Sequence, residues 1–111
     1  MLDFATYQKQ AMTTAVYPGR GEGNFTYPAL GLAGETGEVC EKLKKAIRDE
    51  GGQVSAERRS LLAKELGDVL WYVATLSTEL GLDLETIAAG NLAKLAARKE
   101  AGKIHGSGDL R

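Results

Sequence analysis

The stretch LLAKELGDVLWYVA, residues 61–74, decides the fold of this chain. Apolar residues recur in it at helical spacing, at Leu62, Leu66, Val69 and Val73. Other apolar residues fill the positions between them, so the predicted helix is hydrophobic almost all round. Such a helix must be covered on every side. The stretch therefore predicts a central helix that other helices surround.

Glycine-rich turn signals divide the rest of the chain, and the segments between them also have helical periodicity. Asp3 and Ser55 are suited to N-cap positions. Pro28 is suited to a first helical turn, and Gly81 can end the third helix in a left-handed conformation. The four expected helices cover residues 3–15, 28–50, 55–80 and 83–99.

Strands are poorly supported, because no segment alternates cleanly between apolar and polar residues. Short loops between successive helices favour antiparallel neighbours. The sequence therefore predicts an all-α, four-helix bundle-like fold with antiparallel helices. A single domain accounts for residues 1–111, with residues 100–111 as a Gly-rich C-terminal tail.

Composition excludes several classes of protein. Hydrophobic residues make up 43% of the chain, enough for one core, and no apolar run reaches the roughly eighteen residues of a membrane span. The net charge of −1 shows no excess of positive charge of the kind expected in a dedicated nucleic-acid binder. Cys40 and His105 stand alone, which excludes an internal disulfide and a zinc set. No export signal opens the sequence, so we expect a cytoplasmic protein without a nucleic-acid or membrane partner.

Two acid pairs with a spacing of three residues, Glu35 with Glu38 and Glu65 with Asp68, adjoin apolar stretches, and a third such pair is Glu38 with Glu41. On a helix, each pair projects from one face. Solvated acidic faces also produce such pairs, and chance gives about two in a chain of this composition. The second pair, however, lies inside the apolar stretch without a Lys or Arg three or four residues later, whereas Lys42 can pair with Glu38. Buried carboxylates are costly unless cations or hydrogen bonds compensate their charge.

Glycines accompany both acidic pairs. Gly31, Gly34 and Gly37 follow one another at three-residue steps, and Gly67 lies within the second pair. Each costs about 1 kcal/mol relative to alanine inside a helix. That cost favours a close approach of two helices, or of a helix and a ligand, at these positions. The alternative is that Gly31 and Gly34 precede the helix.

If the two helices lie side by side, the four carboxylates converge. Oxygen ligands without histidine or thiolate select Mg²⁺ or Mn²⁺. Substrate phosphates commonly complete a Mg²⁺ site, so a four-acid cluster suggests phosphoryl chemistry. Glu41 is either an outer ligand or base of this cluster, or a solvated residue.

The motifs GETGE, residues 34–38, and ELGDVLWY, residues 65–72, resemble those of the MazG-like nucleoside triphosphate pyrophosphohydrolases, in the all-α NTP pyrophosphatase superfamily. The resemblance extends to residues 27–35, 91–98 and 106–109. It implies hydrolysis of a nucleoside triphosphate between its α and β phosphates, giving the monophosphate and pyrophosphate. It also implies a catalytic and Mg²⁺-binding set, with Mn²⁺ as a substitute metal, that consists of Glu35, Glu38, Glu65 and Asp68.

The same resemblance implies substrate contacts from Tyr72, Asn91 and Lys94. Asn91, Lys94 and Arg98 form a polar stripe able to meet phosphate oxygens, although any helix carries solvated cations. Tyr72 is alternatively a core aromatic, and Trp71 either packs against helices or stacks on a base. No residue identifies the base. The role expected from the family is house-cleaning or control of the nucleotide pool.

Two other functions are open: a catalytically inactive nucleotide-binding module, and a helical oligomerisation or regulatory module. The second predicts acids paired with Lys or Arg across an interface instead of acids facing one another. A homodimer or homotetramer is expected in any case. Three amphipathic neighbours would leave Leu70, Trp71 or Ala74 partly exposed, and soluble monomers seldom tolerate apolar patches.

Overall fold

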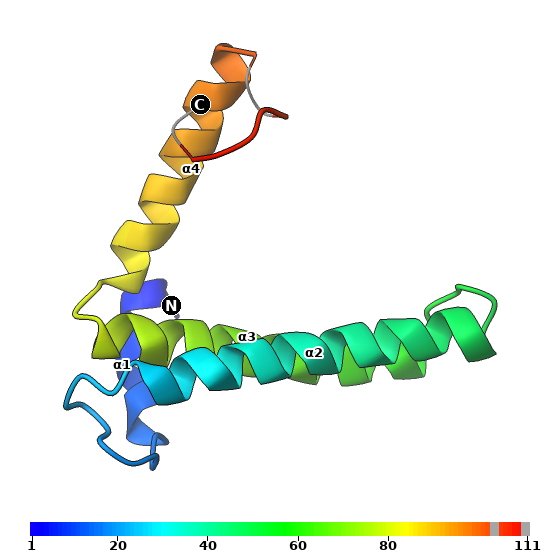
Figure 1. Ribbon diagram of the computed structural model, residues 1–111, viewed down its shortest axis with the longest axis horizontal. Coiled ribbons are helices and arrows are strands. Elements are labelled where there is room, and N and C mark those ends of the chain that lie inside the picture. The colour runs from blue at the N-terminus through cyan, green and yellow to red at the C-terminus, as the bar shows by residue number, and fades with distance from the viewer. Residues whose placement is uncertain (103–104, 110–111) are drawn as a thin grey trace.

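The computed structural model describes residues 1–102 and 105–109, and all regular secondary structure in them is helical. The helices are α1 (Phe4–Thr13), α2 (Thr26–Asp49), α3 (Ala56–Glu79) and α4 (Leu84–Glu100), shown in Figure 1. The prediction of an all-α chain with four helices is confirmed. None of the described helices is long and apolar enough to cross a membrane.

The predicted helix ends are set by local hydrogen bonds. The Asp3 carboxylate accepts a hydrogen bond from the Thr6 N–H at 2.7 Å, and the Ser55 hydroxyl accepts one from the Arg58 N–H at 3.1 Å. Gly81, directly after the C-cap of α3, has a φ of +71°. These three boundaries agree with the sequence, because caps and left-handed turns depend on residues close along the chain.

Helices α2 and α3 form a long antiparallel pair (Figure 1). Gly51 and Gly52, both with positive φ, make the turn that joins them. Arg58 closes this end, since its guanidinium donates to Glu50 at 3.0 Å and to the Lys42 carbonyl at 3.1 Å. This pairing fixes the register that decides which residues of the two acidic motifs meet.

The core lies where α1 packs on the C-terminal half of α3. Ala11, Ala74 and Leu84 are buried there, and Trp71 packs against them while its ring N–H donates to the Thr14 hydroxyl at 3.0 Å. The sequence predicted that Leu70, Trp71 or Ala74 would stay partly exposed, and Leu70 and Trp71 do so. Ala74 is fully buried because α1 covers it.

Helix α4 leaves the other helices after its first turn. Gln8 of α1 fixes its start, accepting a hydrogen bond from the Leu84 N–H and donating to the Leu82 carbonyl, both at 2.9 Å. Beyond that point α4 extends away from the α2–α3 pair (Figure 1). The antiparallel packing predicted for neighbouring helices is therefore found for α2 and α3, and the four helices do not close into a bundle within one chain.

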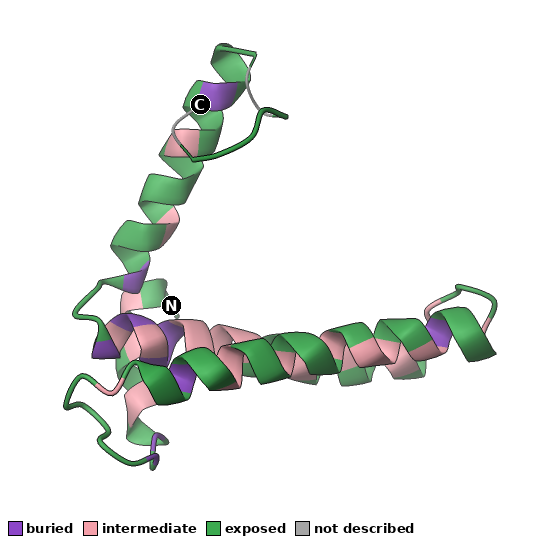
Figure 2. Cartoon of the chain, in the orientation of Figure 1, coloured by how far each residue is buried: buried purple, intermediate pink, exposed green. Residues whose placement is uncertain are grey.

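Few of the residues that the structure describes are buried in the single chain, as the scarcity of purple in Figure 2 shows. Leu30 and Ile47 of α2 are 70% and 72% exposed, and Leu92 of α4 is 71% exposed. Residues 105–109 of the expected tail lie beside α4, and its residues 103, 104, 110 and 111 lie outside the described part of the chain.

Candidate metal centre

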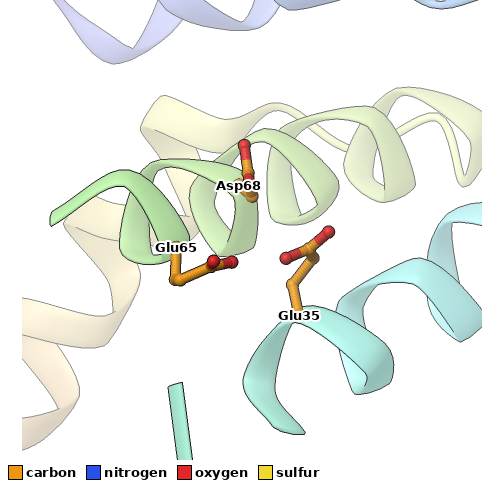
Figure 3. Close-up of side chains that lie close together, drawn as sticks. All are labelled: Glu35, Glu65 and Asp68. Carbon is orange, nitrogen blue, oxygen red and sulfur yellow. The ribbon is translucent and has the colours of Figure 1, made fainter. Parts of the chain in front are cut away.

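Three carboxylates meet between α2 and α3. Glu35 of α2 faces Glu65 and Asp68 of α3, and one oxygen of each lies within 4.8 Å of the others (Figure 3). Glu35 and Glu65 are half-buried, and Asp68 is exposed. The three residues are called the acidic cluster below. They come from both predicted motifs, and the antiparallel pairing of the helices brings them together.

Glu38, the fourth predicted ligand, lies outside the acidic cluster. Its side chain is 57% exposed, and its carboxylate is 3.9 Å from the Lys42 ammonium. That ammonium also contacts Glu65, at 2.9 Å. Spacing within one helix indicated the contact with Glu38. It could not show the contact with Glu65, which crosses from α2 to α3.

Negative charge in the acidic cluster is only partly compensated. Burial and the neighbouring carboxylates, first Glu65 and then Asp68, raise the pKa of Glu35 above its ordinary value of 4.5. The hydrogen bond from Lys42 lowers the pKa of Glu65 and raises the pKa of the lysine itself. Glu35 thus resists ionisation, while Glu65 is held as a carboxylate by one ammonium group.

This geometry fits a hard divalent cation. Mg²⁺ binds oxygens at about 2.0–2.1 Å, so opposite ligands in its coordination sphere lie about 4.2 Å apart. The oxygens of the acidic cluster span 4.8 Å at most, a spacing that small side-chain rotations can close. The cluster contains neither histidine nor cysteine, which suits Mg²⁺ or Mn²⁺ better than zinc. A cation would also relieve the repulsion that raises the pKa of Glu35.

Tyr72 lies one turn beyond Asp68, and its ring rests on the backbone of α2 at Gly31. A Cβ atom at Gly31 would come within 2.2 Å of that ring, so this glycine permits the close helix approach that the sequence predicts. Apart from the nearby backbone of its own helix, a Cβ at Gly34 or Gly37 would meet no described atom within 4 Å. The alternative that Gly31 and Gly34 precede the helix was wrong, because α2 begins at Thr26.

Asn91 and Lys94, the other predicted substrate contacts, lie on α4, which extends away from the acidic cluster within one chain (Figure 1). The Lys94 ammonium is 2.9 Å from the Asp109 carboxylate, and the Arg98 guanidinium is 3.0 Å from the same oxygen. Lys94 and Arg98 of the polar stripe therefore bind a carboxylate of their own chain. Glu41 pairs with Lys44 at 2.9 Å and is outside the acidic cluster.

Sequence reasoning missed a second carboxylate site, which we call the Glu79 clamp. Glu79, 7% exposed, accepts hydrogen bonds from the Tyr17 hydroxyl and from the N–H groups of Gly21 and Gly23, at 2.8 and 2.9 Å for the two glycines. Both glycines have positive φ. The clamp holds the loop that precedes α2. The repeated glycines of that loop were its signal, but local spacing does not connect them to Glu79.

Comparison with known proteins agrees with the motifs. A model of the MazG nucleotide pyrophosphohydrolase domain matches residues 26–102. The Gene 37 protein of Mycobacterium phage L5 is 47% identical over 109 residues, which cover 95% of this chain and 96% of that protein. No solved structure matches the chain at a significant level. The matched residues of the domain model contain all of α2, α3 and α4, and with them the acidic cluster.

Proposed function

This chain belongs to the MazG nucleotide pyrophosphohydrolase family, and we propose that it hydrolyses nucleoside triphosphates between the α and β phosphates. The products would be a nucleoside monophosphate and pyrophosphate. The observation that carries the proposal is the convergence of Glu35, Glu65 and Asp68 from two helices within 4.8 Å. The proposed role of this hydrolysis is to clear unwanted nucleotides from the cytoplasm or to control the nucleotide pool there.

Glu35, Glu65 and Asp68 would hold Mg²⁺, or Mn²⁺ in its place, and Glu38 would join them after turning away from Lys42. The bound ion would polarise the phosphates and lower the pKa of a water molecule. A carboxylate of this set would orient that water and accept its proton. The water oxygen then bonds to the α phosphorus, and the bond from that phosphorus to the bridging oxygen breaks.

The substrate contacts proposed for Asn91 and Lys94 require a second subunit. In one chain α4 extends away from the α2–α3 pair, so these residues would reach the acidic cluster of a partner. The exposed Leu30, Ile47 and Leu92 give a physical reason for assembly, since soluble monomers seldom leave so many large apolar side chains in water. We therefore propose a homodimer or homotetramer with sites near subunit interfaces.

The activity is tested with purified protein, Mg²⁺ and a panel of canonical and modified nucleoside triphosphates. Pyrophosphate and orthophosphate are measured separately, and chelator serves as the control. We expect equimolar monophosphate and pyrophosphate that appear only with metal. Release of orthophosphate alone would contradict cleavage between the α and β phosphates. Nucleotide binding without hydrolysis would instead indicate an inactive binding module.

The assembly is tested by light scattering coupled to gel filtration. We expect at least twice the chain mass of 11.8 kDa at micromolar concentration. Full activity at the mass of a single chain would show that Asn91 and Lys94 do not act on a partner's acidic cluster.

A further inference from the structure

Lys42 brings a positive charge to the acidic cluster from one turn beyond Glu38 on α2. Its ammonium lies 2.9 Å from Glu65 Oε1 and 3.9 Å from Glu38 Oε2, and its side chain is only 21% exposed. We propose that Lys42 is a built-in counter-cation of the centre, which a divalent ion displaces from Glu65 when it binds. This inference rests on the metal centre proposed above.

Competition follows from the shared ligand. Glu65 belongs to the acidic cluster and also accepts the hydrogen bond of Lys42, so the ammonium and a metal ion need the same carboxylate. Two cations on one carboxylate repel each other, and the repulsion is stronger at a half-buried site than in water. Metal binding therefore includes the cost of breaking the contact between Lys42 and Glu65.

The same contact accounts for the position of Glu38. The Lys42 ammonium lies between Glu38 and Glu65 and contacts both, which keeps the fourth predicted ligand outside the acidic cluster. Displacing the ammonium from Glu65 would free both carboxylates in one step. Lys42 thus stabilises the metal-free pair of helices and weakens the first binding of metal.

Arg58 ties the backbone of this part of α2 to α3, which leaves the lysine side chain as the part that would move. Its guanidinium donates to the Lys42 carbonyl at 3.1 Å and to Glu50 at 3.0 Å, so the backbone of α2 at Lys42 is tied to α3 independently of the ammonium. A metal ion can therefore replace the Lys42 ammonium at Glu65 when only the rotamer of the Lys42 side chain changes.

The test is a titration of Mn²⁺, followed by electron paramagnetic resonance of the free ion, without nucleotide. Lys42→Met removes the ammonium and keeps an unbranched apolar side chain that is one atom shorter. Lys45→Met is the matched control, since Lys45 lies on the same helix and pairs with Glu41, at 3.7 Å, instead of with the acidic cluster. Lys42→Gln is a second variant in case the methionine variant does not fold, and Lys42→Arg retains the charge.

We expect Lys42→Met to lower the Kd for Mn²⁺ about fivefold, the upper range of what one surface ion pair contributes to an equilibrium. Lys45→Met and Lys42→Arg should leave it close to the wild-type value. The metal-free melting temperature of Lys42→Met should fall, and its rise with Mn²⁺ should exceed that of the wild type.

A Kd for Lys42→Met equal to that of Lys45→Met, or higher than the wild-type value, would overturn the inference while leaving the metal centre in place. Absence of Mn²⁺ binding in the wild type and in every variant would overturn the centre itself, and the role of Lys42 with it. The two failures are therefore distinguishable in one series of titrations.

Discussion

Helix α3 carries two carboxylate sites that are built in opposite ways. The Glu79 clamp buries one carboxylate and surrounds it with three hydrogen-bond donors. The acidic cluster sets Glu65 and Asp68 against Glu35, with one ammonium group, that of Lys42, in contact with Glu65. In the clamp, hydrogen-bond donors of the same chain stabilise the carboxylate. In the acidic cluster, part of the negative charge is left uncompensated by the chain and is available to a bound cation.

The pKa directions express the same difference. Burial is the largest influence on Glu79 and by itself raises its pKa, but the hydrogen bonds from Tyr17, Gly21 and Gly23 together outweigh it and lower the pKa. At Glu35, burial and the neighbouring carboxylates act in the same direction and raise the pKa. Burial alone therefore does not mark a functional acid, and carboxylates that face one another are the better sign.

The largest difference between the two sites should appear when Glu35 is replaced. Glu35→Gln removes a proposed metal ligand, and we expect metal-dependent hydrolysis to fall about a hundredfold or more, since even outer partners of metal ligands contribute up to that much. The metal-free protein should be as stable as the wild type or more so, because repulsion is relieved. Steady-state kinetics and thermal unfolding with chelator measure the two effects.

Glu41→Gln is the matched control for that replacement, because Glu41 lies on the same helix and pairs with Lys44 outside the acidic cluster. It should retain hydrolysis. Strong destabilisation by Glu35→Gln would mean that Glu35 is a structural residue like Glu79, and the contrast between the two sites would be lost.

Replacing Glu79 should have the opposite outcome. Glu79→Gln puts an amide N–H₂ where the carboxylate accepts three hydrogen bonds, so at least one donor of the loop loses its partner. We expect the free energy of unfolding to fall by about 2–3 kcal/mol, a typical cost for a broken buried charged network. Denaturant unfolding measures it. Glu22→Gln, an exposed acid of the same loop, is the control, and equal stability of the two variants would contradict the clamp.

The sequence predicted the features that depend on nearby residues. Asp3 and Ser55 cap helices through N–H groups three residues away, and acidic pairs with the same spacing share a helix face. The contact of Lys42 with Glu65 and that of Tyr17 with Glu79 join residues 23 and 62 positions apart. Pattern within one helix says nothing about such pairs, because they depend on the register between helices.

The direction of α4 differs from the antiparallel packing that the sequence predicted for neighbouring helices (Figure 1). A short connection after Gly81 favours an antiparallel neighbour, but the path of the chain is set by Gln8, which binds both Leu82 and Leu84 from α1. Asn91 and Lys94 lie on α4, which extends away from the α2–α3 pair (Figure 1). The roles proposed for them depend on assembly. The apolar pattern of α3 predicted an oligomer, but it did not indicate which part of a partner subunit α4 would meet.

A smaller effect is expected at the glycine that lets α2 approach α3 beside the acidic cluster. Gly31→Ala would place its Cβ within 2.2 Å of the Tyr72 ring, so the ring or the helices must shift, at an expected cost of about 1–2 kcal/mol in unfolding free energy. Gly37→Ala, with no described atom within 4 Å apart from the backbone of its own helix, should stabilise the chain by up to about 1 kcal/mol. Denaturant unfolding compares them. Equal stability of Gly31→Ala and the wild type would show that the Tyr72 ring moves aside without a cost. Destabilisation by Gly37→Ala would indicate that a partner subunit packs on α2 at Gly37.

The smallest effect is the pH dependence of stability, and its sign should differ between the two sites. The raised pKa of Glu35 means that the folded state holds a proton above pH 4.5 that the unfolded chain has lost, so stability falls as the pH rises through this window. The lowered pKa of Glu79 gives stability that is present above pH 4.5 and is lost as the pH falls below it.

With chelator present, the stability advantage of Glu35→Gln over the wild type should therefore grow from pH 4.5 towards neutrality. The deficit of Glu79→Gln should shrink below pH 4.5. Parallel curves for the wild type and Glu35→Gln would show that the acidic cluster carries no uncompensated charge, and would remove the electrostatic reason for a metal ion there.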